Sequence, residues 1–571
     1  RQVVYVGAND GMIHAFNAGF YNASCQRFEL QPTNAVCTPS TPGASGTTTS
    51  TPTAHPLGAE IWAYVPKNLL PHLRWLTDPS YKHTYYVDGS PIAFDAKIFS
   101  ADATHTNGWG TVLVVPFRLG GGAITINAPV KNTSGNAVNT NVTADSAYVL
   151  MDITNPELPP TVLGEITLPG TWTTSAPAVV MMRDATSGTP NKFYLAIGSG
   201  PTNAKAVASN QHLRVNVYNV ADFVSASVAP IPTKFDMTNA GSEGGTAAAD
   251  ALNSSAGDLI ASDFNLDGIA ESVYFGSILG DGSSSKFGGH FWRLLTNGDP
   301  AAKNWTAQEM LHMTDATVGA TDGMPVTVRP TLGRNARGAP MVYFGTGRLF
   351  DNEDKATADT QRIFGLVDTK LLPPTDAQAT TKIVLGNLVN VTNVNVNGTT
   401  NAVSGLPTGN DALSGVSDFV GLASAFNAPG IAGWYRNLAT NGPSNPSERV
   451  VSAQALLGGL LLTAAYTPGT SICTGLGTSV LYGQNYETGT GDPSGFFGVN
   501  STTGNVNVTS EIGAGLPAPP SLHTGNGSNA DGGKTVTACT QTSTGAIVCK
   551  DVATLKPVTS GESSWREPLG K

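Results

Sequence analysis

The 571-residue chain has few charged residues and no long apolar stretch. Only 13% of its residues are charged, lysine and arginine occur singly, and the net charge is −10. Nucleic-acid binding depends on clustered cations, so this composition argues against a nucleic-acid partner. The negative charge also argues against binding to anionic lipid. The most apolar run, residues 455–466, contains two glycines and is too short to span a bilayer, so we expect a buried pair of strands there.

Cysteine is scarce too, and the spacing of the five cysteines excludes several kinds of site. No CxxC, CxxCH or Cys/His zinc spacing occurs, which leaves thiolate metal sites and c-type haem without support. Cys25 and Cys37 flank a short polar segment, and Cys539 and Cys549 flank a predicted hairpin. Two local disulfides of this kind would suit a secreted protein and would leave Cys473 over. The alternative is five free thiols.

Helical patterning is rare, and short β-branched and aromatic runs between turn residues dominate the chain. The clearest predicted strands are residues 3–7, 12–17, 111–116, 147–153, 193–197, 272–275, 291–295, 340–344 and 460–465. The best helix candidate is residues 67–76, despite Pro71. Asp10 and Gly11 lie between the first two strands and predict a hairpin turn.

A loose repeat predicts the fold class. A strand ending in glycine, a polar turn and a strand with an aromatic residue recur at residues 4–19, 273–298 and 342–350. Such repetition without helices is typical of β-propeller blades. Seven blades would take about 80 residues each, well above a compact blade, so long insertions are needed. Residues 26–55, 121–146 and 375–418 have the composition of such insertions, either solvated or functional. We therefore expect one all-β propeller domain over residues 1–571.

The sharpest motif is DFNLDGIAE at residues 263–271. Asp263, Asn265 and Asp267 carry oxygen side chains at alternate positions, and Gly268 permits a sharp turn, as in the first half of an EF-hand loop. Ca²⁺ prefers six to eight oxygen ligands. We expect this spacing to bring the three side-chain oxygens to one point, where they would contribute to such a set.

The second half of the motif supplies the remaining predicted ligands. The backbone carbonyl of Ile269 faces the ion and the side chain of Glu271 closes the site. Tyr274, not glutamate, occupies the twelfth position, and a strand follows in place of a helix. We therefore predict a calcium loop within a β-protein, with Asp258 as an extra ligand or a solvated acid. The alternative is a polar turn without metal.

Other polar groups carry weaker signals. The acidic residues 351–354 would hold a second cation or form a solvated turn. His14, His72, His83 and His290 lie in apolar or aromatic runs, where we expect structural roles. No GxSxG or HExxH motif occurs, and no Asp/Glu pair has a recognisable catalytic context. The sequence therefore favours a protein that is not an enzyme.

The order of motifs resembles the C-terminal propeller domain of the PilC/PilY-type adhesins of type IV pili. The similar segments are VYVGANDGMIHAFNAG (4–19), EIWAYVP (60–66), YKHTYYVDGS (81–90), WGTVLV (109–114), YVLMDITNP (148–156), the loop at 263–271 with the following VYFG and FWRL, VYFGTGR (342–348), GWY (433–435), ERVVS (448–452) and SWRE (564–567). The resemblance spans nearly the whole chain, and the shared order makes it specific.

This resemblance implies a distorted seven-bladed, quinoprotein-dehydrogenase-like β-propeller outside the cell, at the pilus tip. It implies a role in pilus biogenesis with minor pilins, attachment to host or abiotic surfaces, and twitching motility. Bound Ca²⁺ would oppose pilus retraction, with Asp263, Asn265, Asp267, Ile269 and Glu271 as ligands. The family's large N-terminal region is not in the sequence, which begins without methionine, so we expect the chain to be part of a longer protein.

Two other functions stay open. Propellers also include quinoprotein dehydrogenases, which bind their quinone beside calcium, but such a site calls for adjacent cysteines and the chain has none. A lectin-like, carbohydrate-binding propeller would be compatible with adhesion.

Overall fold

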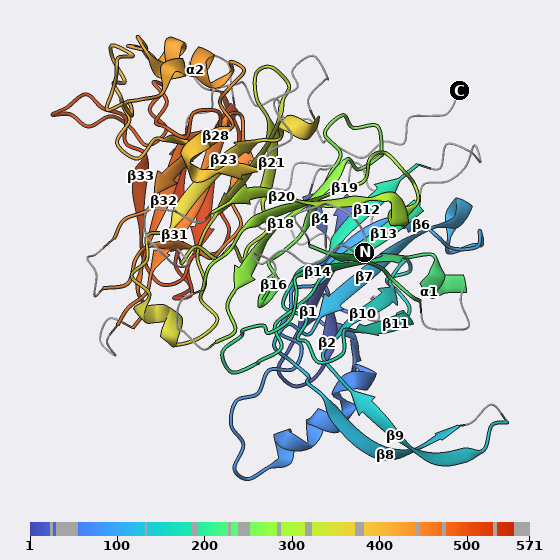
Figure 1. Cartoon of the computed structure of the whole chain (residues 1–571). Helices are drawn as coiled ribbons and strands as arrows, with labels where there is room; N and C mark the ends of the chain where they lie inside the picture. Colours follow the sequence, from blue (N-terminus) through green and yellow to red (C-terminus); the bar gives the residue numbers. More distant parts are fainter. Residues whose placement is uncertain are drawn as a thin grey trace, which may run out of the picture. The chain divides into compact units, whose positions relative to one another are not determined.

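The chain folds mainly into β-strands that form two compact units (Figure 1). The computed structural model describes residues 1–22, 27–29, 55–131, 134–183, 192–225, 230–237, 252–282, 287–313, 323–371, 382–440, 445–470, 475–528 and 534–552. The first unit comprises Arg1–Ala204, Arg214–Phe235 and Asp299–Lys303, and the second comprises Lys205–Leu213, Asp236–Gly298 and Asn304–Lys571. None of the helices in these ranges is long and apolar enough to cross a membrane.

Antiparallel sheets make up the first unit. One sheet has β1 (Val3–Gly7), β2 (Ile13–Asn17) and β5 (Glu60–Tyr64). The next has β6 (Ile92–Lys97), β7 (Trp109–Pro116), β10 (Ala147–Asp152) and β11 (Thr161–Thr167). A further sheet has β12 (Ala178–Met182), β13 (Lys192–Gly198), β14 (Arg214–Asn219) and β15 (Thr233–Asp236). Separate hairpins join β3 (Phe20–Asn22) to β4 (Arg27–Glu29) and β8 (Ile124–Lys131) to β9 (Ala137–Ala144), and the helical turns are η1 (Lys67–Thr77), η2 (Thr106–Gly108) and α1 (Asp222–Ser225).

The second unit contains larger sheets. One sheet has β16 (Ser254–Ala256), β17 (Ile260–Ser262), β18 (Ser272–Leu279), β19 (Phe291–Leu295), β20 (Thr306–His312) and β24 (Ile383–Val384). Another has β21 (Thr331–Arg334), β22 (Pro340–Gly345), β23 (Arg362–Val367), β28 (Gly433–Asn437) and β25 (Val389–Asn390). A third has β29 (Arg449–Val450), β30 (Ala455–Leu457), β31 (Leu460–Thr467), β32 (Thr478–Asn485) and β33 (Thr509–Ala514).

Smaller elements complete this unit. The strands are β26 (Asn395–Val396) paired with β27 (Val403–Ser404), and the sheet of β34 (Ser521–Ser528), β35 (Lys534–Gln541) and β36 (Ile547–Val552). The helices are α2 (Phe419–Phe426) and the short turns η4 (Ala302–Asn304, which begins in the first unit), η5 (Glu353–Ala356), η6 (Thr369–Leu371), η8 (Leu385–Asn387) and η9 (Asp411–Leu413). Asp418 caps α2 by accepting a hydrogen bond from the Gly421 amide.

Strands that follow one another in sequence pair with one another, as in propeller blades. Turn chemistry explains two of these hairpins. Between β1 and β2, Gly11 adopts a φ of 93°, which a residue with a Cβ rarely does. Between β30 and β31, Gly458 and Gly459 have φ values of 55° and 86°. The predicted hairpin at Asp10–Gly11 and the predicted strand pair at residues 455–466 are both confirmed.

Each predicted strand overlaps an observed one, and the predicted helix at residues 67–76 is the 3₁₀ helix η1. Residues 121–146 include the hairpin of β8 and β9, which extends away from the sheets of the first unit (Figure 1). Residues 382–418 hold only short strands and turns. Most of residues 26–55, and residues 375–381, lie outside the described residues.

A disulfide joins Cys539 and Cys549 across β35 and β36, as the spacing predicted. Cys25, Cys37 and Cys473 lie outside the described residues, so their pairing stays a prediction.

Trp434 belongs to a buried apolar cluster of the second unit. Its side chain is fully buried, and its indole N–H donates to the Tyr486 carbonyl at 3.3 Å. A Cβ added to Gly365 would lie 2.4 Å from Trp434 Cε2, and one added to Gly489 would lie 2.4 Å from Trp434 Cδ2. The absence of side chains at both glycines is what makes room for the indole ring.

We expect Gly365→Ala to lower the free energy of unfolding by about 1–3 kcal/mol, because the new methyl group overlaps Trp434. Gly386→Ala is the matched control, since a Cβ there meets nothing within 4 Å. Denaturant unfolding of the two variants measures the difference. Equal stability of the two variants would contradict the proposed packing role.

Candidate functional site

Residues 263–271 connect two neighbouring strands, β17 and β18, which pair antiparallel up to Ser262 and Ser272. The amide of Glu271 donates to the Ser262 carbonyl at 2.8 Å and closes the base of the loop. The amide of Thr296, just after β19, donates to the Glu271 carbonyl at 3.0 Å. The predicted calcium loop is therefore held on both sides by the backbone of the sheet.

Three of the predicted ligands fold inward over the backbone of this loop. The carboxylate of Asp263 accepts hydrogen bonds from the amides of Asp267 at 3.1 Å and Gly268 at 2.9 Å. The side-chain oxygen of Asn265 accepts from the Asp267 amide at 3.0 Å, and that of Asp267 accepts from the Ile269 amide at 2.8 Å. These bonds place oxygen atoms from alternate positions along the inside of one turn.

Two left-handed residues produce this curl. Gly268 has a φ of 81°, as the predicted sharp turn requires. Leu266 has a φ of 58°, although leucine seldom adopts this conformation. Its side chain is 86% exposed, so no apolar packing stabilises it there. The polar side chains on either side of Leu266 therefore determine its backbone conformation.

Glu271 is placed differently from the other three side chains. Its carboxylate accepts from the amides of Phe264 at 2.8 Å and Asn265 at 3.4 Å. Burial raises the pKa of Glu271, and the charge of Asp263 acts in the same direction, while the amide hydrogen bonds oppose both. Glu271 therefore ties the start of the loop to its end.

A pocket of about 540 Å³ opens beside the loop. Asn265, Asp267, Ile269 and Glu271 line one part of its wall, and Lys370 from η6 also lines it. Four of the five predicted ligand residues therefore border a pocket that can hold water or an ion.

The donor set of this loop suits a hard cation, because it consists of carboxylate, amide and carbonyl oxygens. In the described part of the chain, however, Asp263, Asp267 and Glu271 do not form a group whose ligand atoms all lie within 4.8 Å of one another. Glu271 accepts bonds from two amides, but each carboxylate oxygen keeps a second lone pair for an ion. The donor types suit a calcium site, but the three carboxylates have to move closer together before they surround one ion.

The remaining acidic candidates divide into two cases. Asp258 does not line the pocket, and its amide donates to the Thr327 carbonyl at 3.2 Å. Asp354, expected in a solvated turn, is instead 2% exposed and forms an ion pair with Arg348. Its carboxylate also accepts from the amides of Phe350 and Asp351, so Asp354 is a structural residue of the second unit.

The histidines that the sequence predicts to be structural lie in different surroundings. His72 is buried and contacts the Gly122 carbonyl at 3.0 Å, as expected of a packed residue. His14 lies between the carboxylates of Asp10 and Glu60, at 2.9 and 2.7 Å. His83 is exposed and forms an edge contact with Tyr85.

Two groups of interacting side chains were not found from the sequence. Tyr274, in the twelfth loop position, is fully buried, and its hydroxyl donates to Asp368 at 2.7 Å. Asp368 also pairs with Arg293 and accepts from the Lys370 amide at 2.9 Å, which fixes the segment that bears Lys370. These contacts join residues that are far apart in sequence, and no local motif marks them.

The second group consists of His290, Glu309 and His312, whose ligand atoms all lie within 4.8 Å of one another. The sequence predicts a structural role for His290 and carries no motif at Glu309 or His312. The only local signal is the three-residue spacing of Glu309 and His312, which in a regular strand would place them on opposite faces.

Several known proteins are similar to the chain, although no model of a protein family matches it. It is 26% identical to a type IV pilus biogenesis factor PilY1 homolog of Xylella fastidiosa over 99% of this chain and 35% of that protein. It is 24% identical to the type IV pilus biogenesis factor PilY1 of Pseudomonas aeruginosa (strain PAO1) over 85% of this chain and 34% of that protein. The chain thus spans about a third of the length of these relatives.

The crystal structure of the Pseudomonas aeruginosa PilY1 C-terminal domain matches 96% of this chain and 92% of that domain, with a TM-score of 0.55 and 20% identity. This domain is a β-propeller, so the match confirms the predicted all-β propeller fold class, while the number of seven blades stays a prediction. Over most of its length the chain is therefore similar to PilY1-type type IV pilus biogenesis factors.

Proposed function

We propose that the chain is the C-terminal propeller region of a type IV pilus biogenesis factor that binds Ca²⁺ through the loop at residues 263–271. The observation that carries the proposal is the inward folding of Asp263, Asn265 and Asp267 over one turn. The similarity to PilY1-type proteins over nearly the whole chain supports the pilus role. Those relatives are named as biogenesis factors, which favours this role over an enzymatic one.

In this proposal the protein acts outside the cell, at the pilus tip, with minor pilins as partners. It supports attachment to host or abiotic surfaces, and calcium at the loop regulates the balance of pilus extension and retraction. The loop is suited to regulation because it lies beside an open pocket, so that an ion can enter and leave. Bound Ca²⁺ supplies positive charge that neutralises Asp263, Asp267 and Glu271 and holds their oxygens together.

We expect Asp267→Asn to weaken Ca²⁺ binding at least about tenfold, because it removes one negative charge from the ligand set. The asparagine oxygen still accepts the Ile269 amide hydrogen bond, so the turn persists. Asp411→Ala is the matched control, because Asp411 is an exposed acid in the same unit and lies outside the loop. Calorimetric titration with Ca²⁺ compares the three proteins. Wild-type affinity in Asp267→Asn would remove the loop from the proposal.

The cellular role is tested by placing Asp267→Asn in the full-length protein of the host bacterium. We expect fewer surface pili and altered twitching motility, because retraction is no longer opposed by bound calcium. In a strain that cannot retract its pili, we expect the variant to give as many surface pili as the wild-type protein gives in the same strain. Normal pili and twitching with the variant present at wild-type amounts would contradict the regulatory role, even if the loop binds calcium.

A further inference from the structure

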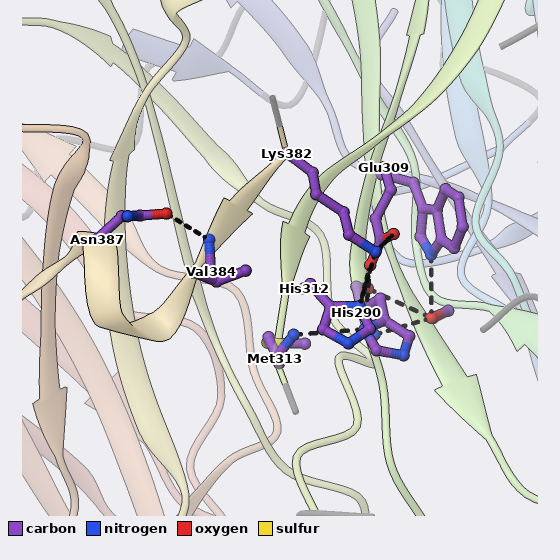
Figure 2. Close-up of polar contacts among 9 residues, drawn as sticks. His290, Glu309, His312, Met313, Lys382, Val384 and Asn387 are labelled. Carbon is purple, nitrogen blue, oxygen red and sulfur yellow. Dashed lines mark hydrogen bonds and ion pairs between the residues drawn. The ribbon is translucent and has the colours of Figure 1, made fainter. Parts of the chain in front are cut away.

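A cluster of two imidazoles and one carboxylate lies at the end of β19 and β20 that is remote from the calcium loop. His290 immediately precedes β19, while Glu309 and His312 belong to β20. Figure 2 shows their side chains converging, with the side chain of Lys382 reaching the carboxylate of Glu309 from the segment before β24. The cluster, which we call the His–Glu–His cluster, lies entirely within the second unit.

A β-bulge explains why Glu309 and His312 meet. Phe291 pairs with Leu311, but Trp292 pairs with Glu309, so Met310 is an extra residue in β20. Side chains in a regular strand alternate between faces, and residues three apart point in opposite directions. The extra residue shifts this alternation by one. The two side chains therefore reach each other, with His312 Nδ1 2.7 Å from Glu309 Oε1.

The backbone holds the third member, His290, in a fixed place. Its amide donates to the Ser277 hydroxyl at 3.0 Å, and its carbonyl accepts from the Ser277 amide at 2.9 Å. The imidazole rings of His290 and His312 stack with a centroid separation of 4.5 Å. Nδ1 of His290 lies 3.3 Å from Glu309 Oε1. The three side chains are thus arranged by the fold itself, which favours tight binding of a ligand.

We propose that His290, Glu309 and His312 bind a divalent transition-metal ion of the zinc class, in competition with the ammonium group of Lys382. Imidazole nitrogen and carboxylate oxygen are ligands that Zn²⁺ accepts at about 2.0–2.2 Å, and a tetrahedral site places two such atoms about 3.4 Å apart. The 3.3 Å between His290 Nδ1 and Glu309 Oε1 is close to this value, and the 2.7 Å hydrogen bond between His312 Nδ1 and Glu309 Oε1 opens when the ion enters. Three protein ligands leave a fourth position for water.

The donor chemistry separates this cluster from the calcium loop. Two of its three ligands are nitrogen atoms, whereas Ca²⁺ takes oxygen ligands. The loop at residues 263–271 has no imidazole and lies at the opposite end of β18 and β19. The two sites therefore select different ions and can be tested separately.

In the absence of a metal ion, the ammonium group of Lys382 is the cation that pairs with Glu309. Its ammonium group lies 3.1 Å from Glu309 Oε2 and 3.4 Å from His312 Nδ1. The side chain of Glu309 is only 2% exposed, and a buried carboxylate without a cation is costly. Lys382 is 39% exposed, so its ammonium group can turn to water when a metal takes its place.

The protons of the cluster cannot satisfy all of these contacts at once. His312 Nδ1 faces an acceptor, Glu309, and a donor, Lys382, so one protonation state serves only one of them. His290 Nδ1 likewise faces Glu309 and the donating amide of Met313, at 3.3 Å each. A metal ion accepts the lone pairs of both rings and of the carboxylate together.

The experiment titrates the full chain with Zn²⁺ in calcium-containing buffer, against a chromogenic chelator. We expect wild type to bind one equivalent at this cluster, and His312→Ala to bind it at least about tenfold more weakly. Lys382→Met should bind Zn²⁺ more tightly, by about threefold or more, because it removes the competing charge. Visible absorption of the Co²⁺-loaded protein reports whether the ion is bound with the predicted tetrahedral geometry.

His83→Ala is the matched control, because it removes an exposed imidazole in the first unit. It should leave the affinity unchanged, and so should Asp267→Asn. Since Lys382→Met and His312→Ala move the affinity in opposite directions, a loss of fold cannot produce both results. Wild type without a zinc site, or equal affinities in wild type, His312→Ala and Lys382→Met, would overturn the proposal and leave the calcium loop unaffected.

Discussion

The backbone pairing of β18, β19 and β20 is the constraint on which both candidate sites depend. At one end of these strands, the Thr296 amide holds the Glu271 carbonyl and thereby the end of the loop at residues 263–271, the proposed calcium site. At the other end, the pairing of Ser277 with His290 positions the first imidazole of the His–Glu–His cluster. Arg293, in β19 between these two ends, forms a buried ion pair with Asp368. The same ladder of backbone hydrogen bonds therefore holds both sites in place.

Local chemistry in the sequence predicted much of this fold. Asp10 and Gly11, and the glycines after β30, mark hairpins because only certain residues reach positive φ without strain. The spacing of oxygen side chains with Gly268 likewise predicted a sharp turn, and Gly268 has a φ of 81°, while the calcium ligands stay a prediction. These features depend on residues within a few positions of one another, and so the pattern alone carries them.

The parts that could not be predicted depend on pairing over long distances. Met310 has no sequence feature that marks it as the extra residue of a bulge, because a bulge is a property of two strands in register. Lys382 lies 73 residues from Glu309, and Tyr274 lies 94 residues from Asp368. No local motif marks the packing of Trp434, which depends on the absence of a Cβ at Gly365 and Gly489. Asp354 pairs with Arg348 only six residues away, but Arg348 also donates to the carbonyl of Ala206, 142 residues distant, and this contact could not be predicted.

The edge strand β24 has only two residues, paired in parallel with Leu311 and His312. Lys382, directly before it, adds an ion pair to Glu309 that tethers this short strand to its neighbour. Whatever releases Lys382 from Glu309 also weakens the hold on β24, and whatever peels β24 away makes Glu309 more available. Such coupling is reciprocal by thermodynamic necessity. A force that pulls β24 from this sheet edge would therefore favour an ion in the His–Glu–His cluster, and an ion bound there would make β24 easier to detach.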